Sequence, residues 1–263
     1  MPRAKRRLGQ HFLTDPRILA RIADALEAEA DDTILEIGPG PGGLTAELVK
    51  RAGRVVAIEK DRDLIAPLRA RFPTSEIIEG DALQVDWHAL LKSPFLVAGN
   101  IPYNITSPLL DKALTPPQPR RIVFLVQKEV AERVTALPGT SAYGALSVGV
   151  QVVSRAKRLF TVPAGAFQPK PKVDSSVLCL TPRIDPMVAS AERESFRSVV
   201  VGLFSFRRKQ LQRAIRELTG WDPSQANSVL RNAGLPEAVR PEVLSPAEFV
   251  RLWRALVDGG WNL

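Results

Sequence analysis

The sequence has very few residues that bind soft metals or form disulfides. In 263 residues it contains one cysteine, Cys179, and two histidines, His11 and His88. A single cysteine excludes an internal disulfide, and this set is too small for an ordinary zinc cluster. No apolar run approaches the roughly 20 residues that a membrane-spanning helix needs, and no apolar signal core follows the basic N-terminus. We therefore expect a cytoplasmic protein that holds no metal and has no membrane partner.

Basic residues outnumber acidic ones. The formal net charge is +8 at pH 7 and the pI is about 10.0. Arg3, Lys5, Arg6 and Arg7 form a local cluster within a basic arm at residues 1–13. Such a balance is typical of proteins that meet nucleic acid or an anionic surface.

The most informative stretch runs from Ile34 to Gly43, with the sequence ILEIGPGPGG. An apolar β-branched run suits a buried parallel strand, and the glycines and prolines after it end that strand. Gly38, Gly40 and Gly43 fit the pattern G-x-G-x-x-G, and a helical pattern starts at Leu44. Glu59 ends the next apolar run, where an acid that binds ribose hydroxyls is expected.

This loop has two interpretations that its own residues do not separate. A dinucleotide could place its pyrophosphate over the start of the helix, on N–H groups that the glycines leave free. S-adenosylmethionine also carries a ribose that needs an acid at the end of the second strand. A helix precedes the first strand, with Thr14 or Asp15 near its cap and Pro16 in its first turn, and this favours the second interpretation mildly.

Strands and helices alternate through the first 180 residues, which predicts an α/β fold with a doubly wound sheet. After Pro182 only helical periodicity remains, including a capping box at Ser245–Glu248. We therefore expect a sheet domain at 1–183 and a small all-helical domain at 184–263. The expected strands are 33–37, 54–58, 76–78, 95–98, 121–126, 159–162 and 173–180, the last two possibly antiparallel.

The tetrapeptide Asn100-Ile101-Pro102-Tyr103 follows the fourth expected strand. The lone pair of an exocyclic base amine is delocalised, so acceptors must hold its N–H groups and orient the nitrogen. The Asn100 side-chain carbonyl and the Ile101 backbone carbonyl can do this, and Pro102 fixes the turn. Tyr103 can stack on an extruded base. The segment therefore favours methyl transfer to a base amine, in which orientation supplies most of the catalysis.

Taken in order, the motifs resemble the ribosomal RNA small-subunit adenine N6,N6-dimethyltransferase family, the KsgA family. The similarity covers nearly the whole chain. Each motif alone is weak evidence for the family, but the ordered set is specific to it. The matching segments are residues 9–13, 36–40, 80–82, 100–104, 127–131, 142–144, 167–175, 204–209 and 244–249. Family members often carry Asn at the position of His11 and Gln at that of Phe206.

The resemblance implies a Rossmann-like S-adenosylmethionine-dependent methyltransferase. Its activity would be dimethylation of N6 of two adjacent adenines in the 3′-terminal hairpin of small-subunit (16S) rRNA, during biogenesis of the small ribosomal subunit. The implied cofactor contacts are His11, Leu13, Gly38, Gly40, Glu59, Lys60, Asp81, Ala82 and Asn100. Phe167 would stack on the target base opposite Tyr103. Arg207, Arg208 and Lys209 would contact RNA phosphates, and we expect a monomer.

Three alternatives remain at this point. A resistance-type enzyme that methylates an adenine of large-subunit rRNA uses the same chemistry. A non-catalytic RNA-binding factor could share the fold, although the complete set of site residues argues against it. A nicotinamide dehydrogenase is disfavoured by the Asn100–Tyr103 motif and by the lack of an evident hydride-transfer acid.

Overall fold

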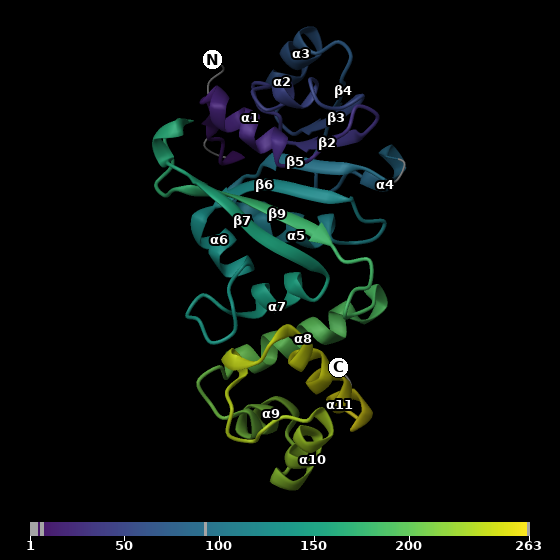
Figure 1. Ribbon diagram of the computed structural model, residues 1–263, viewed down its shortest axis with the longest axis vertical. Coiled ribbons are helices and arrows are strands. Elements are labelled where there is room, and N and C mark those ends of the chain that lie inside the picture. Colours follow the sequence, from purple (N-terminus) through teal and green to yellow (C-terminus); the bar gives the residue numbers. More distant parts are fainter. Residues whose placement is uncertain (1–4, 6–7, 92–93, 262–263) are drawn as a thin grey trace. The chain divides into compact units, whose positions relative to one another are not determined.

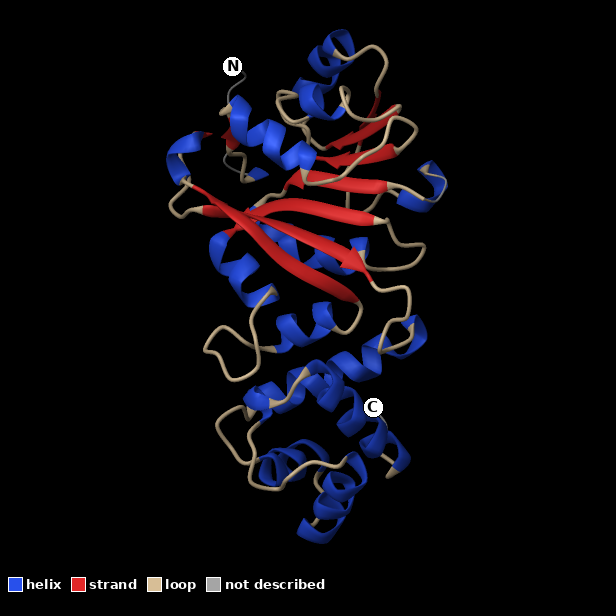
Figure 2. Cartoon of the chain, in the orientation of Figure 1, coloured by secondary structure: helices blue, strands red, loops and turns tan. Residues whose placement is uncertain are grey.

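The computed structural model describes residues 5, 8–91 and 94–261, and the chain divides into two compact units (Figures 1 and 2). The first unit comprises 1–131 and 156–182, and the second comprises 132–155 and 183–263. Three members of the predicted basic cluster, Arg3, Arg6 and Arg7, lie outside the described residues. Among the helices of the described chain, none has both the length and the apolar character to cross a membrane.

The first unit is built on a seven-stranded sheet in the order β4-β3-β2-β5-β6-β9-β7. The five strands from β4 to β6 are parallel, and β9 runs antiparallel to β6. This confirms the predicted doubly wound sheet and the antiparallel direction of the strand expected at 173–180, which follows a proline-rich loop at 163–171. Its strands are β2 (Thr33–Ile37), β3 (Arg54–Glu59), β4 (Glu76–Glu79), β5 (Leu96–Asn100), β6 (Arg121–Gln127), β7 (Ser154–Val162) and β9 (Ser175–Pro182).

Helices cover both faces of this sheet (Figure 1). Asp15 caps α1, whose Leu19 and Ile22 pack with Leu48 of α2 against the strands. Asp61 caps α3, as predicted, and Leu64 and Leu68 of that helix cover Ala57 and Ile77. The helices of this region are α1 (Pro16–Asp24), α2 (Thr45–Leu48), α3 (Arg62–Arg71), α4 (Trp87–Leu90), α5 (Thr106–Ala113) and α6 (Lys128–Val134).

A two-stranded sheet was not predicted. It joins β1 (Phe12–Leu13) to β8 (Phe167–Gln168) in antiparallel register, with Leu13 opposite Phe167. These strands have two residues each, too few for a periodic pattern to reveal them in the sequence. The pairing brings the N-terminal segment to the proline-rich loop, 155 residues further along the chain.

The second unit is helical and has an aromatic core. The Phe204 ring stacks on Phe249 at 5.4 Å between centroids, and Phe196 meets Trp253 edge-on at 5.7 Å. The predicted capping box is present, since Ser245 Oγ accepts from the N–H of Glu248. The helices are α7 (Ala145–Gln151), α8 (Arg193–Ser205), α9 (Leu211–Thr219), α10 (Pro223–Ala233) and α11 (Pro246–Asp258).

Residues 132–155 were expected in the sheet domain, but they belong to the second unit. Tyr143 explains this difference. Its side chain is only 1% exposed, its hydroxyl donates to the Leu244 carbonyl at 2.8 Å, and its ring meets Phe204 edge-on. These partners lie about 60 and 100 residues away in the chain. The local sequence pattern therefore could not show that residues 132–155 belong to the second unit.

Candidate active site

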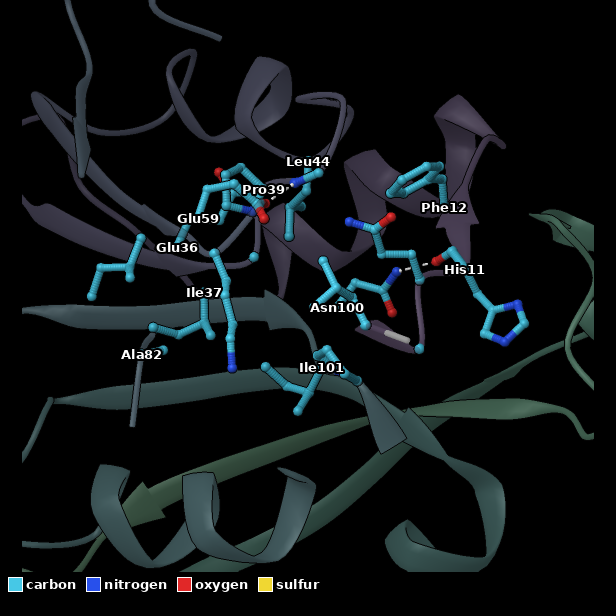
Figure 3. A pocket seen from close by; sticks show the side chains of 18 of the residues that line it. His11, Phe12, Glu36, Ile37, Pro39, Leu44, Glu59, Ala82, Asn100 and Ile101 are labelled. Carbon is cyan, nitrogen blue, oxygen red and sulfur yellow. Dashed lines mark hydrogen bonds between the residues drawn. The ribbon is translucent and has the colours of Figure 1, made fainter. Parts of the chain in front are cut away.

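A pocket opens at the carboxyl ends of β2, β3 and β5, where ligands of doubly wound sheets bind (Figure 3). It encloses about 1160 Å³ when its open mouth is included, enough for a nucleoside with a long substituent. All lining residues belong to the first unit, and residues 8–13 form one side. The predicted residues that line it are His11, Leu13, Gly38, Gly40, Glu59, Lys60, Asp81, Ala82, Asn100, Ile101, Pro102 and Tyr103.

The glycine-rich loop is folded by bonds that use its own N–H groups. Gly38 and Gly40 have φ values of +66° and +57°, a conformation that glycine adopts without strain. The Gly38 N–H donates to the Ile58 carbonyl at 2.9 Å, and the Gly40 N–H donates to Glu59 Oε2 at 3.0 Å. These two donors are therefore not free for a phosphate, contrary to the expectation for a dinucleotide site.

Glu59 lies at the end of β3 and is 5% exposed. Its other oxygen, Oε1, accepts the Asp61 N–H at 2.7 Å. Burial raises the pKa of the Glu59 carboxyl, and the backbone N–H groups of Asp61 and Gly40 oppose that rise. Both oxygens are thus held by backbone and keep further lone pairs for hydroxyl donors, as the expected ribose contact requires.

Glu36 is a second buried carboxyl in the pocket, and the sequence reasoning did not select it. It is 1% exposed, and its Oε2 accepts from Thr45 Oγ1 at 2.6 Å. Burial raises the pKa of Glu36 to about 8, the Thr45 bond opposes this, and the nearby Glu59 adds to it. The sequence could have identified Glu36 as a candidate, because it is the only charged residue in the apolar run of β2 and buried carboxyls are rare.

Asp81 follows β4 and faces the same pocket. Its Oδ2 pairs with Lys60 Nζ at 2.7 Å, and its Oδ1 accepts the Leu83 N–H at 3.0 Å. The bond from Lys60 is the main cause that lowers the pKa of Asp81, so this carboxyl is ionised at neutral pH. We call Glu36, Glu59 and Asp81 the acidic wall of the pocket.

The N-terminal segment is tied to the acidic wall by contacts that the sequence did not suggest. Lys5 Nζ and Gln10 Nε2 meet the two oxygens of Asp61 at 2.5 and 3.0 Å. Asp61 is itself 3% exposed and donates its N–H to Glu59. The segment that carries Gly9 and Gln10 is therefore held at the pocket through one buried aspartate.

Asn100 ends β5 on the opposite side of the pocket (Figure 3). Its Nδ2 donates to the His11 carbonyl at 2.7 Å. Because a carbonyl can only accept, this bond fixes the amide orientation, and Asn100 Oδ1 accepts no bond from the described residues. The Ile101 N–H is used by the Leu125 carbonyl at 3.0 Å, so Ile101 offers the pocket an acceptor and no backbone donor.

Tyr103 is half-buried beside Asn100, and its hydroxyl is 3.0 Å from Ser175 Oγ. Its ring stacks with the His11 imidazole, with centroids 5.9 Å apart and planes inclined by 22°. The His11 ring points away from Glu59 and Asn100 in Figure 3, and its Nδ1 bonds the Pro169 carbonyl at 2.7 Å. We call His11, Asn100 and Tyr103 the aromatic wall.

Phe167, expected to stack on the target base, is buried in this structure, and its stacking role stays a prediction. Phe167 is 5% exposed and packs in the core with Leu13, its partner in the β1–β8 pair. It is not among the residues that line the pocket. The pairing of β8 with β1 joins this segment to the N-terminal segment.

The basic triplet predicted to contact RNA lies in the second unit. Arg207 pairs with Glu242 at 2.9 Å, and Lys209 pairs with Glu217 at 2.6 Å. The Lys209 ammonium also lies 5.0 Å from the centroid of the Phe206 ring. Two of the three cations are thus partly neutralised by carboxylates of their own unit, while in the described residues Arg208 forms no ion pair.

Comparison with known proteins agrees with the geometry of fold and pocket. The chain is 27% identical to a crystallised dimethyladenosine transferase from Plasmodium falciparum, with a TM-score of 0.86 over 95% of this chain and 98% of that one. It is 29% identical to the crystallised 23S rRNA methyltransferase ErmE, with a TM-score of 0.74 over 94% and 99%. The sheet is therefore that of a Rossmann-like methyltransferase.

The family follows from the sequence matches. The model of the family "Ribosomal RNA adenine dimethylase" matches residues 1–254. The "Ribosomal RNA small subunit methyltransferase A" of Geobacter metallireducens is 42% identical over 98% of this chain and 97% of its own. The chain belongs to the ribosomal RNA adenine dimethylase family.

Proposed function

We propose that this protein dimethylates N6 of two adjacent adenines in the 3′-terminal hairpin of small-subunit (16S) rRNA, with S-adenosylmethionine as methyl donor. The observation that carries the proposal is the orientation of Asn100. Its amide nitrogen is held by the His11 carbonyl, and its Oδ1, which no described residue bonds, lies at the edge of a nucleoside-sized pocket. Family membership over nearly the whole chain supports the same reaction.

The acidic wall supports S-adenosylmethionine over a dinucleotide. Glu36 and Glu59 lie at the glycine-rich loop, where a pyrophosphate would sit, and the Gly40 N–H already bonds Glu59. Buried carboxyls with no cation beside them among the described residues disfavour an anion at this place, Glu59 by its charge and Glu36, whose pKa is about 8, by the further cost of ionising it, whereas a ligand with hydroxyl groups and positive charge is accommodated. Glu59 would take the ribose hydroxyls, and Asp81 would accept the adenine amine on a lone pair that Lys60 leaves free.

The chemistry requires orientation more than proton transfer. When bound, S-adenosylmethionine supplies an electrophilic methyl group on a sulfonium sulfur, which keeps the electron pair as the methyl leaves. Asn100 Oδ1 and the Ile101 carbonyl would accept the N–H groups of the target amine and turn its lone pair toward the pocket. Tyr103 would support the extruded base by stacking. No strong general base is needed, because the N6 proton leaves after the new bond has formed.

Small-subunit rRNA is the substrate that the relatives favour. The bacterial relative named for the small subunit is 42% identical over nearly the whole chain, and the large-subunit enzyme is 29% identical. We infer that the protein acts on the small ribosomal subunit, and we further propose that it does so in the cytoplasm and as a monomer. The resistance-type reaction on large-subunit rRNA is the second candidate, because it would use the same pocket.

The test is transfer of labelled methyl groups to small subunits that lack this modification, with large subunits and naked rRNA as controls. We expect N6,N6-dimethyladenosine in small subunits alone. Label in naked large-subunit rRNA would replace the proposal with the resistance-type reaction. Tight binding to small subunits without any label would indicate a binding factor.

A further inference from the structure

Three backbone carbonyls of the loop that follows β4 accept hydrogen bonds from side chains. The Ala82 carbonyl accepts from the indole Nε1 of Trp87 at 2.9 Å. The carbonyls of Leu83 and Val85 both accept from Lys112 Nζ, at 2.9 and 2.6 Å. The shape of this loop is therefore held by donors from outside its own backbone.

Lys112 lies on α5, a helix that begins three residues after Tyr103. Its side chain is half-buried, and its ammonium lies 5.3 Å from the centroid of the Trp87 ring. Burial lowers the pKa of Lys112, and the nearby carboxylates of Asp86 and Asp81 oppose this shift. A lysine usually keeps its ammonium in water, so here the two carbonyls and the indole face take the place of part of that water.

The bonds of Lys112 reach Asp81 through one residue, Leu83. The Leu83 N–H donates to Asp81 Oδ1 at 3.0 Å, while the Leu83 carbonyl accepts from Lys112. The other oxygen of Asp81 pairs with Lys60, whose side chain is 61% exposed, and such pairs hold a carboxylate only weakly. Lys112 is not among the residues that line the pocket, so it can act on a ligand there only through this loop.

We propose that Lys112 is a positioning residue for the cofactor adenine, and that its ammonium holds the loop at Leu83 and Val85 so that Asp81 meets the 6-amino group. This inference rests on the proposed function, which assigns the adenine amine to Asp81. Because α5 follows the segment Asn100–Tyr103, the same lysine ties the loop at the adenine end of the pocket to the helix that follows the base-handling segment.

The test compares two ligands that differ only at position 6 of the purine. One is S-adenosylhomocysteine, the product that remains after methyl transfer, and the other is its analogue with hydrogen in place of the 6-amino group. Both Kd values are measured by calorimetry without RNA. In the wild type the analogue should bind about 10- to 100-fold more weakly, as expected for the loss of one hydrogen bond to a charged group.

Lys112→Met removes the donors while keeping a long side chain, and it should lower this Kd ratio at least about threefold. Lys112→Arg keeps the charge and N–H donors and should stay within about twofold of the wild-type ratio. Asp81→Ala should bring the two Kd values within about twofold of each other, and adding Lys112→Met to it should lower the ratio no further. The matched control is Lys50→Met, at an exposed lysine that pairs with Glu47, and it should keep the wild-type ratio.

A purely structural role of Lys112 would raise both Kd values equally and leave their ratio unchanged, and this result would overturn the inference. If Lys112→Met does not fold, Lys112→Gln, which loses the charge and shortens the side chain, is measured in its place with the same criterion. A wild-type ratio close to 1 would remove the Asp81 contact and this inference with it. The proposed function fails instead if the wild type methylates no small subunits, which the binding ratio does not measure.

Discussion

The side chains of the two walls are held by opposite kinds of hydrogen bond: those of the acidic wall accept, and those of the aromatic wall donate. In the acidic wall, Glu59 is fixed by backbone N–H groups and Glu36 by a threonine hydroxyl, and both carboxyls are buried. In the aromatic wall, Asn100 and His11 each donate to a backbone carbonyl, which orients the Asn100 acceptor oxygen and the His11 ring. The first wall suits a cation with hydroxyl groups, and the second suits a neutral base that donates N–H groups.

The largest effect should come from the aromatic wall. Asn100→Ala removes the oriented acceptor, and we expect methyl transfer to fall at least 100-fold, as for other preorganised polar groups in active sites. Cofactor binding should remain measurable, because the acidic wall is intact. Single-turnover transfer to small subunits measures this, with Asn232→Ala, an exposed asparagine of α10, as the control. Full activity of Asn100→Ala would remove its assigned role.

A substitution in the acidic wall should lower the affinity for S-adenosylmethionine. Glu59→Ala removes a carboxylate expected to take both ribose hydroxyls, and cofactor affinity should fall at least tenfold, which corresponds to about 1.4 kcal/mol. Calorimetric titration measures the change. Glu76→Ala, which alters an exposed acid paired with Arg54, should leave affinity within about twofold. An unchanged affinity of Glu59→Ala would place this residue outside the site.

Site residues that follow a strand could be predicted from the sequence. Contacts that depend on tertiary pairing of distant segments could not. Glu59, Asp81 and Asn100 each follow a strand, and parallel strands bring their carboxyl ends to one edge. The contact of His11 with Tyr103 depends on a two-residue strand pair that no periodic pattern reveals. The burial of Phe167 depends on the same pair.

Glu36, a member of the acidic wall, should make the free energy of unfolding of the protein depend on pH. Its pKa of about 8 in the folded chain lies above the ordinary value of 4.5, so the folded chain keeps a proton that the unfolded chain releases in this window. The free energy of unfolding should therefore fall as pH rises from 4.5 to about 8, by up to about 1.4 kcal/mol per pH unit from this group.

Urea unfolding without cofactor, compared with Glu36→Gln, isolates this contribution. The free energy of unfolding of the wild type minus that of Glu36→Gln should fall steadily across the window and level off above it. A constant difference from pH 5 to pH 8 would mean that Glu36 is already ionised in the folded chain.

The smallest effect should come from the basic triplet of the second unit. Arg208→Ala should weaken binding to small subunits and reduce the slope of log affinity against log salt by about 1, if it contacts one phosphate. Arg207→Ala should do less, because Arg207 already pairs with Glu242. Filter binding at several salt concentrations measures both slopes. Equal slopes for Arg208→Ala and the wild type would remove Arg208 from the RNA contact.

The separation of the two walls is tested most directly by calorimetric titration of S-adenosylmethionine into the wild type, Glu59→Ala, Asn100→Ala and the double variant. We expect a loss of affinity of at least tenfold with Glu59→Ala, a smaller loss with Asn100→Ala, and a loss in the double variant close to the product of the two. A loss with Asn100→Ala as large as that with Glu59→Ala would contradict the separate roles of the two walls, because both walls would then serve the cofactor.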